Sequence, residues 1–160
     1  MPIRKNLEIL RDPYLPWGGL KGAVVCKQCG AVYRNKSWSL YAAPAALKGH
    51  AVRSIVCPAC RKVHDHFTAG IVALRGEFLK IHKEQILHLV RNEEARAGRV
   101  NPLERIIAIK DKNGEIEIST TSERFAQRIG RKLERAYKGR TVYHWSGGDK
   151  QVRVEWCRAA

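Results

Sequence analysis

Two pairs of cysteines constrain this chain more than any other feature of its sequence. Cys26 and Cys29 form one Cys-x-x-Cys pair, Cys57 and Cys60 form the second, and 27 residues lie between the pairs. A gap of two residues lets both thiolates of a pair face one ion, and zinc prefers four such ligands in a tetrahedron. Two disulfides, a redox pair and an iron–sulfur cluster are the alternatives. We predict a loop-rich zinc ribbon over residues 26–70 that holds one structural Zn²⁺ ion.

The same four cysteines argue against a catalytic metal. A catalytic zinc usually has three protein ligands and one open position, whereas four cysteines close the shell. His64, Asp65 and His66 follow the second pair, and they could form a second metal site or an acid–base pair. A polar turn that leaves the ribbon is the simpler interpretation. We therefore expect a protein that is not an enzyme and has no small-molecule substrate.

The charge balance indicates a polyanionic partner. The 160 residues include 30 Lys+Arg against 15 Asp+Glu, a formal net charge of +15. Nucleic acid is the first candidate and an anionic membrane surface the second. No stretch approaches about 20 consecutive apolar residues, and the first residues contain no apolar signal-peptide core. We expect a cytoplasmic monomer whose cysteines stay reduced and which does not enter a membrane.

The residues on either side of the ribbon predict three further segments. Residues 1–25 contain punctuating prolines and glycines and predict an extended arm. Residues 71–102 predict a linking segment with a helix over 76–97, since apolar side chains recur there at three- and four-residue intervals and Gly98 stands at the expected end. Residues 103–160 predict a β-β-α-β-β module, small enough to need the linking helix for its core. The predicted fold class is therefore α+β.

Turn and capping residues mark the elements of the module. Asn113-Gly114 is a strong hairpin signal, and Thr120 and Glu123 have the spacing of a capping box. Gly139 stands where a left-handed residue commonly ends a helix. The expected strands cover 105–110, 115–119, 140–145 and 151–157, and the expected helix covers 121–138. Cys157, His82 and His144 are interpreted as core residues.

The helix over 121–138 is the first candidate surface for nucleic acid. Five cations recur at gaps of four, three, four and three residues, which keeps them on one helical face. They are Arg124, Arg128, Arg131, Arg135 and Lys138. Arginine can grip phosphate with two hydrogen bonds, so a polyphosphate backbone suits this stripe. A solvated surface helix and a membrane-surface helix are the alternatives.

The ribbon is the second candidate surface. Residues 26–70 contain seven basic residues and one acidic residue, a net charge of +6. The candidate contacts are Arg34, Lys36, Trp38, Lys48, Arg53, Arg61 and Lys62. Aromatic rings beside cations can stack on unpaired bases, so Tyr33, Trp38 and Tyr41 could read looped RNA. They could equally brace a ribbon core that has few other large side chains.

Two stretches of the sequence resemble known families. The first runs from Asp12-Pro13-Tyr14 through Cys26-Lys27-Gln28-Cys29-Gly30-Ala31-Val32-Tyr33 to Cys57-Pro58-Ala59-Cys60-Arg61 and resembles a small bacterial zinc-ribbon family. The second includes Gly76-Glu77-Phe78, His82, Arg91-Asn92-Glu93-Glu94 and Thr120-Thr121-Ser122 up to Arg128-Ile129-Gly130. It is similar to the nonsense-mediated-decay protein 3 family, the adaptors of the large ribosomal subunit. Those proteins have more cysteine pairs and additional domains. The resemblance implies binding to ribosomal RNA on the intersubunit side of the large subunit.

These observations favour a non-catalytic zinc-ribbon protein that binds ribosomal RNA on the ribosome. Bound where tRNA or factors act, such a protein would block or protect an idle ribosome, so hibernation under stress is the specific hypothesis. Assistance in ribosome assembly is equally compatible with the residues. A DNA-binding, transcription-associated zinc ribbon is the next alternative, although helix-turn-helix spacing is not evident. A nucleic-acid-modifying enzyme centred on His64, Asp65 and His66 is the third.

Overall fold

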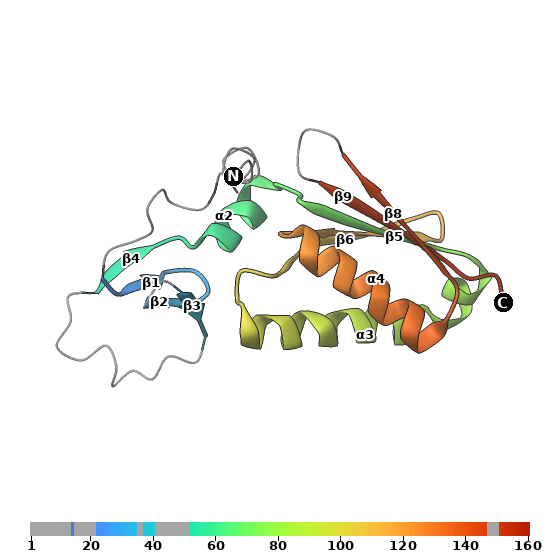
Figure 1. Ribbon diagram of the computed structural model, residues 1–160, viewed down its shortest axis with the longest axis horizontal. Coiled ribbons are helices and arrows are strands. Elements are labelled where there is room, and N and C mark those ends of the chain that lie inside the picture. The colour runs from blue at the N-terminus through green and yellow to red at the C-terminus, as the bar shows by residue number, and fades with distance from the viewer. Residues whose placement is uncertain (1–13, 15–21, 35–36, 41–51, 147–150) are drawn as a thin grey trace, which may run out of the picture.

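The computed structural model describes residues 14, 22–34, 37–40, 52–146 and 151–160, and its fold is α+β (Figure 1). A four-cysteine cluster lies on a small sheet, a long helix follows, and a mixed five-stranded sheet with a second helix completes the described chain. This order of parts was predicted from the sequence. Most of the predicted arm over 1–25 lies outside the described residues.

The small sheet consists of four strands of three residues each. They are β1 (Val24–Cys26), β2 (Val32–Arg34), β3 (Ser37–Ser39) and β4 (Arg53–Ile55). Their spatial order is β3-β2-β1-β4, and only the β1–β4 pair is parallel. The helix α2 (Pro58–Asp65) comes next. The sequence analysis expected loops here, but Cys57 caps this helix and Pro58 occupies its first turn, where the missing N–H costs nothing.

The larger sheet has the order β6-β7-β5-β9-β8. Its strands are β5 (Gly70–Arg75), β6 (Ile106–Lys112), β7 (Glu115–Thr120), β8 (Arg140–Trp145) and β9 (Val152–Cys157). The four strands predicted for residues 103–160 all form, but they do not make one sheet by themselves. β5 lies between the two hairpins, antiparallel to β7 and parallel to β9. The helix predicted over 76–97 is confirmed by α3 (Glu77–Val100). The strand β5 was not predicted, because residues 71–75 were assigned to the linking segment.

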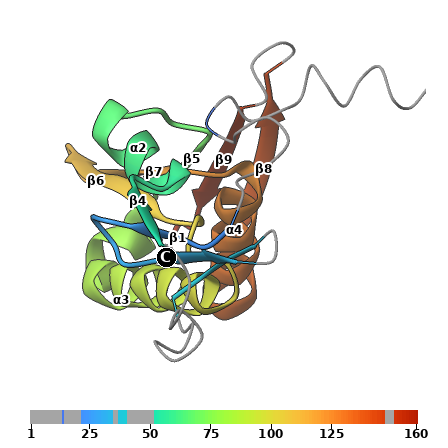
Figure 2. The ribbon, with the colours of Figure 1, turned by 90° about the vertical axis from the view of Figure 1, so that its left-hand side faces the viewer.

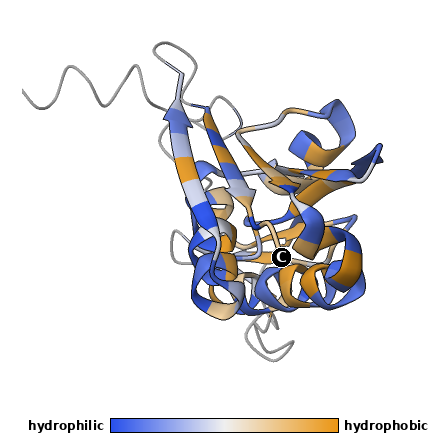
Figure 3. Ribbon diagram, turned by 90° about the vertical axis from the view of Figure 1, so that its right-hand side faces the viewer, coloured by the Kyte–Doolittle hydropathy of each residue, from blue (hydrophilic) through white to orange (hydrophobic). Residues whose placement is uncertain are grey.

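Two helices cover one face of the five-stranded sheet. They are α3 (Glu77–Val100) and α4 (Glu123–Tyr137), which lie side by side under the strands (Figure 2). Apolar and polar residues alternate along β7 and β9, and buried residues alternate with more exposed ones along β5, so that these strands turn one apolar face toward the helices (Figure 3). The helices bury that face in a single core whose members come from both helices and the strands. The expected use of the long helix in this core is confirmed by Leu79, Ile86 and Val90, which are fully or almost fully buried.

The ends of three elements follow from local backbone chemistry. Asn113 and Gly114 both have positive φ, as the predicted hairpin turn requires. α3 continues past Gly98 to Val100 and stops at Asn101, because the residue before Pro102 is disfavoured in helical conformation. α4 is capped by Ser122, whose Oγ accepts from the N–H of Phe125 at 3.1 Å, so the predicted capping box at Thr120 does not form.

The cysteine-bearing part and the five-stranded part contact each other through residues of α2 and of the segment before β6. Leu103, just before β6, packs against the apolar core of the small sheet. The Nζ of Lys62 in α2 donates to the carbonyl of Thr121, 3.0 Å away, and is buried there. These contacts place the cysteine cluster beside the C-terminal end of α3 and the start of β6.

Candidate metal centre and cationic surfaces

The sulfur atoms of Cys26, Cys29, Cys57 and Cys60 converge on one point. Their Sγ atoms all lie within 4.8 Å of one another. The Cys26–Cys60 and Cys29–Cys57 sulfurs are 3.8 Å and 3.7 Å apart. A tetrahedron with metal–sulfur bonds of about 2.3 Å has edges of about 3.8 Å, whereas a disulfide bond is about 2.05 Å long. The four cysteines could therefore hold one metal ion, and the cluster is typical of a zinc-binding site.

Two local structures position these cysteines. Cys26 ends β1, and the following turn returns through Gly30, whose N–H donates to the Cys26 carbonyl and whose φ is +78°. A left-handed φ of this kind favours glycine, so Gly30 suits this tight turn. On the other side, Cys57 is the N-cap of α2 and Cys60 lies in the first turn. A strand end and a helix start thus each present one pair.

Backbone N–H groups point at the sulfurs and change their acidity. Burial acts to raise the pKa of Cys26, but N–H donors from Cys29, Cys57 and Gln28 lower its pKa to about 6. Burial raises the pKa of Cys29 and of Cys57. Several thiolates in one buried place repel each other, and a divalent cation offsets that cost because it binds thiolate directly. The donor set therefore suits a thiophilic cation.

An arginine from the five-stranded part completes this centre. The Nη1 of Arg105 donates to the Sγ of Cys60 at 3.0 Å. A charged donor to a ligand sulfur reduces the negative charge of a four-thiolate centre and orients the ligand. Sequence reasoning did not find Arg105, because it lies 45 residues beyond Cys60 and no local pattern links the two.

The aromatic residues of the ribbon lie in its core. Tyr33 and Trp38 are each 8% exposed, and their ring centroids are 5.4 Å apart. Of the two roles left open for these rings, the burial supports bracing of the small core. Tyr41 lies outside the described residues. Trp38 therefore does not belong to the exposed cationic surface.

The cations predicted on α4 are mostly on its exposed side. Arg124, Arg131, Arg135 and Lys138 are exposed, and Arg128 is half-buried. Arg128 turns toward α3, where its Nε lies 3.2 Å from Oε2 of Glu93. The apolar face packs on the sheet, and Gly130 lets the helix come so close that a Cβ there would lie 2.6 Å from Val154.

The cations predicted on the ribbon have different surroundings. Arg34, Arg53 and Arg61 are exposed. Lys62 is 6% exposed and donates to the Thr121 carbonyl, so its role in the structure is to join α2 to the larger sheet. Lys36 and Lys48 lie outside the described residues.

Three other residues differ from their expected surroundings. Cys157 is exposed, not buried, because it alternates with Trp156 and so stands on the uncovered face of the sheet. His144 lies on that same face, with Nε2 3.5 Å from Glu155, and is not a core histidine. His82 is half-buried against the ring of Phe78, at a point where α3 is kinked.

The segment His64-Asp65-His66 ends α2. His66 is the left-handed C-cap of the helix, and its N–H donates to the carbonyl of Val63. Hydrogen bonds from His64 and from the Tyr14 hydroxyl lower the pKa of the exposed Asp65 carboxyl. These contacts are those of a polar helix end, the simpler interpretation offered by the sequence.

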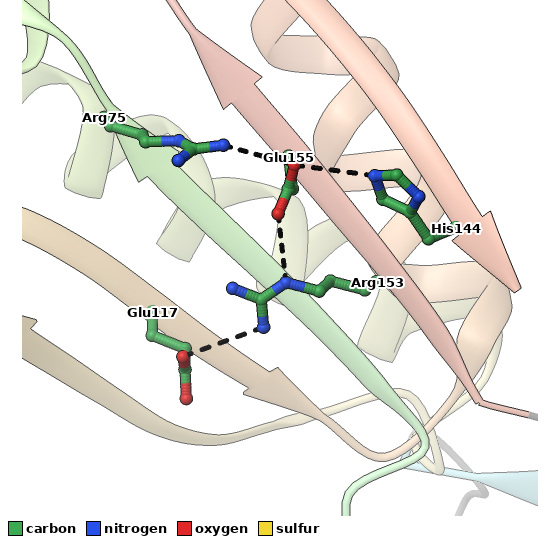
Figure 4. Close-up of polar contacts among 5 residues, drawn as sticks. All are labelled: Arg75, Glu117, His144, Arg153 and Glu155. Atoms are coloured by element: carbon green, nitrogen blue, oxygen red, sulfur yellow. Dashed lines mark hydrogen bonds and ion pairs between the residues drawn. The ribbon is translucent and has the colours of Figure 1, made fainter. Parts of the chain in front are cut away.

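The uncovered face of the five-stranded sheet holds a network of opposite charges (Figure 4). Glu155 contacts Arg75, Arg153 and His144, and Arg153 also reaches Glu117. The hydrogen bond from Arg153 lowers the pKa of Glu155. Acids and bases alternate across neighbouring strands here, as cross-strand pairs usually do. This face therefore carries cations that already have carboxylate partners.

Fold and site define an α+β protein with a four-cysteine cluster that could hold one metal ion. Comparison with known proteins identifies no family: no protein-family model, no curated protein and no solved structure matches the chain. The two resemblances described above therefore remain predictions. Within the part of the chain that the structure describes, no helix is long and apolar enough to cross a membrane.

Proposed function

We propose that this chain is a non-catalytic RNA-binding protein, that its four cysteines hold one structural zinc ion, and that ribosomal RNA is its target. The observation that carries the proposal is the exposed stripe Arg124, Arg131 and Arg135 on α4, with the exposed Lys138 directly after the last residue of the helix. The three arginines share one side of a helix whose other side is packed on the sheet. A phosphate backbone is the partner whose charge spacing and density suit such a stripe.

Zinc is the metal we propose for the cysteine cluster. The sulfur spacings agree with a tetrahedral shell, and four sulfur ligands favour zinc among the common divalent ions. A closed four-cysteine shell leaves no position for water or substrate, so the ion would supply structure only. It would hold β1 and the start of α2 together and so fix the exposed arginines of the ribbon.

An exposed aromatic residue favours RNA with unpaired bases over duplex DNA. Trp145, at the end of β8, is 58% exposed. It follows Tyr143 on the same face of the strand, and Tyr143 is close enough to Arg131 for that cation to lower its pKa, although burial raises the pKa more. Bases stack on such rings when they are unpaired. A duplex reader would need a helix or ribbon in the major groove.

The cellular role we propose is protection of idle ribosomes. A small, strongly basic protein bound at an RNA surface where tRNA or factors act would compete with them. Assistance in assembly uses the same binding surface and differs in timing. Sedimentation of lysates from growing and starved cells separates the two roles: a hibernation factor comigrates with complete ribosomes in starved cells, and an assembly factor with incomplete subunits in growing cells.

The direct test is cosedimentation of the purified protein with ribosomes at low and raised salt. We expect comigration at low salt that weakens as salt rises. The variant Arg124→Gln/Arg131→Gln/Arg135→Gln should lose comigration. The matched control Arg75→Gln/Lys110→Gln/Arg153→Gln removes the same charge from the uncovered sheet face and should retain it. Equal behaviour of the two triple variants, or no comigration of the wild type, would overturn the proposal.

A further inference from the structure

A buried carboxylate between the two long helices is surrounded by three cations. The side chain of Glu93 in α3 is only 4% exposed. Arg96 and Lys132 lie 3.5 Å and 3.7 Å from its Oε1, and Arg128 lies 3.2 Å from its Oε2. Two of these cations come from α4 and one from α3, so the cluster spans the contact between the helices.

The charges in this cluster do not balance. One carboxylate stabilises about one cation, so three cations on one carboxylate leave about two positive charges in excess. The nearby Glu104 faces Arg128 but also Arg124, and Glu84 lines the same groove as Arg91, so each added carboxylate comes with an added cation and the excess persists. Like charges held this close repel, and an anion beside them would remove that cost.

The cations are presented along an open groove. A cavity of about 800 Å³ lies between α3 and α4, and Glu93, Arg96 and Lys132 line it together with Arg91 and His88. The ion pairs with Glu93 use Nη1 of Arg96 and Nζ of Lys132. Each of these groups has more than one N–H donor, and a phosphate group accepts several at once.

We propose that this groove is a phosphate-binding site and that Glu93 is the positioning residue that assembles its cations. Buried between the helices, Glu93 fixes the side chains of Arg96 and Lys132 before a ligand arrives, which reduces the ordering cost of binding. The ligand is a group with two or more phosphates in a row. We take the molecule that supplies these phosphates to be the RNA backbone, and in this respect alone the inference rests on the proposed function. A free oligophosphate has the same chemistry.

The effect of removing the Glu93 charge distinguishes positioning from simple electrostatics. Glu93→Gln raises the net charge, so electrostatics alone predicts tighter binding of any polyanion. If Glu93 positions Arg96 and Lys132, its loss should weaken binding about fivefold, because the charge-assisted contacts of these cations with phosphate become less well ordered. Glu84→Gln is the matched control, since Glu84 lines the same groove, is exposed and belongs to the same helix. It should tighten binding slightly, within about twofold.

The measurement is isothermal titration of the full-length protein with inorganic tripolyphosphate, and separately with an RNA hairpin. Arg96→Gln provides a second variant that should fold normally, because Arg96 is 61% exposed. It should weaken tripolyphosphate binding about fivefold. Its control is Arg99→Gln, one turn along α3 and beside a different cavity, which should change affinity less than twofold.

Each outcome separates the two proposals. If Glu93→Gln and Arg96→Gln both lower the affinity for tripolyphosphate and for the RNA hairpin, the site is supported with RNA as the source of phosphate. If the two variants lower the affinity for tripolyphosphate and the protein does not bind the RNA hairpin at all, the site is supported but the proposed function is overturned. RNA binding that Glu93→Gln tightens as much as Glu84→Gln does overturns the site and leaves the proposed function standing. If neither ligand binds, both are overturned.

Discussion

The cysteine-bearing part and the five-stranded part of this chain bury their side chains by different means. The first has strands of three residues, and its two largest core side chains, Tyr33 and Trp38, retain some exposure. The second buries Trp156, Phe125 and many aliphatic residues completely. A small sheet cannot exclude enough apolar area to offset the entropy of folding, whereas a sheet covered by two helices can. The difference predicts that the first part depends on an ion held by its four cysteines and that the second part does not.

The largest expected effect is the loss of the small sheet when the metal is removed. Binding of structural zinc contributes on the order of 10 kcal/mol, more than a core of this size can supply. A strong chelator should abolish amide protection over 24–34 and 53–65. Protection over 70–75 and 106–157 should remain. Hydrogen exchange with mass spectrometry measures both, and simultaneous loss in both parts would show that they unfold as one unit.

The second effect is on the larger core. Trp156→Ala should lower the free energy of unfolding by about 3–5 kcal/mol, because it removes a completely buried ring. It also removes the hydrogen bond from Nε1 to the Lys138 carbonyl, 2.7 Å long. Trp145→Ala on the neighbouring strand is the control and should cost less than about 0.5 kcal/mol. Denaturant unfolding followed by circular dichroism measures both; similar losses would contradict the described core.

A smaller expected effect concerns the contact of Arg105 with the cysteine cluster, which joins the two parts. Arg105→Met removes the donor to the Cys60 sulfur and should lower metal affinity about tenfold, the lower end for outer-shell partners. Arg61→Met removes an exposed cation from α2 and should leave affinity nearly unchanged. Competition with a chromophoric chelator gives both constants. Equal affinities for the two variants would mean that Arg105 does not act on the metal centre.

The smallest effect depends on pH. Burial raises the pKa of Glu104, and Arg124 and Arg128 offset part of the rise. A carboxyl with a raised folded-state pKa stabilises the fold at low pH, and that contribution is lost as pH rises through the folded pKa. Glu104→Gln should therefore become more stable relative to the wild type between pH 5 and pH 8. Unfolding at both pH values tests this, with Glu115→Gln as the control for charge; a constant difference would contradict it.

Local signals in the sequence were sufficient to predict most of the helices and strands. The cysteine spacing predicted the four-cysteine cluster, and the Asn113-Gly114 pair predicted the hairpin of β6 and β7. The strand β5 was missed because residues 71–74 are a short, continuous apolar run without the polar–apolar alternation of a strand, although Gly76 separates it from the helix. Glu93 left a signal that was not used: it falls on the same helical stripe as Ile86, Val90 and Ala97, all buried.

The sequence by itself determined the four-cysteine cluster, the order of the parts and the excess of positive charge, because these depend on residue type and short spacing. Only the tertiary structure decided which cations are exposed, which are paired and which are buried. Lys62 and Arg128 have the same sequence signature as Arg61 and Arg124, yet one is buried against a carbonyl and the other faces Glu93. The reason is that a charge's partners come from segments distant in the chain, and no local pattern encodes their approach.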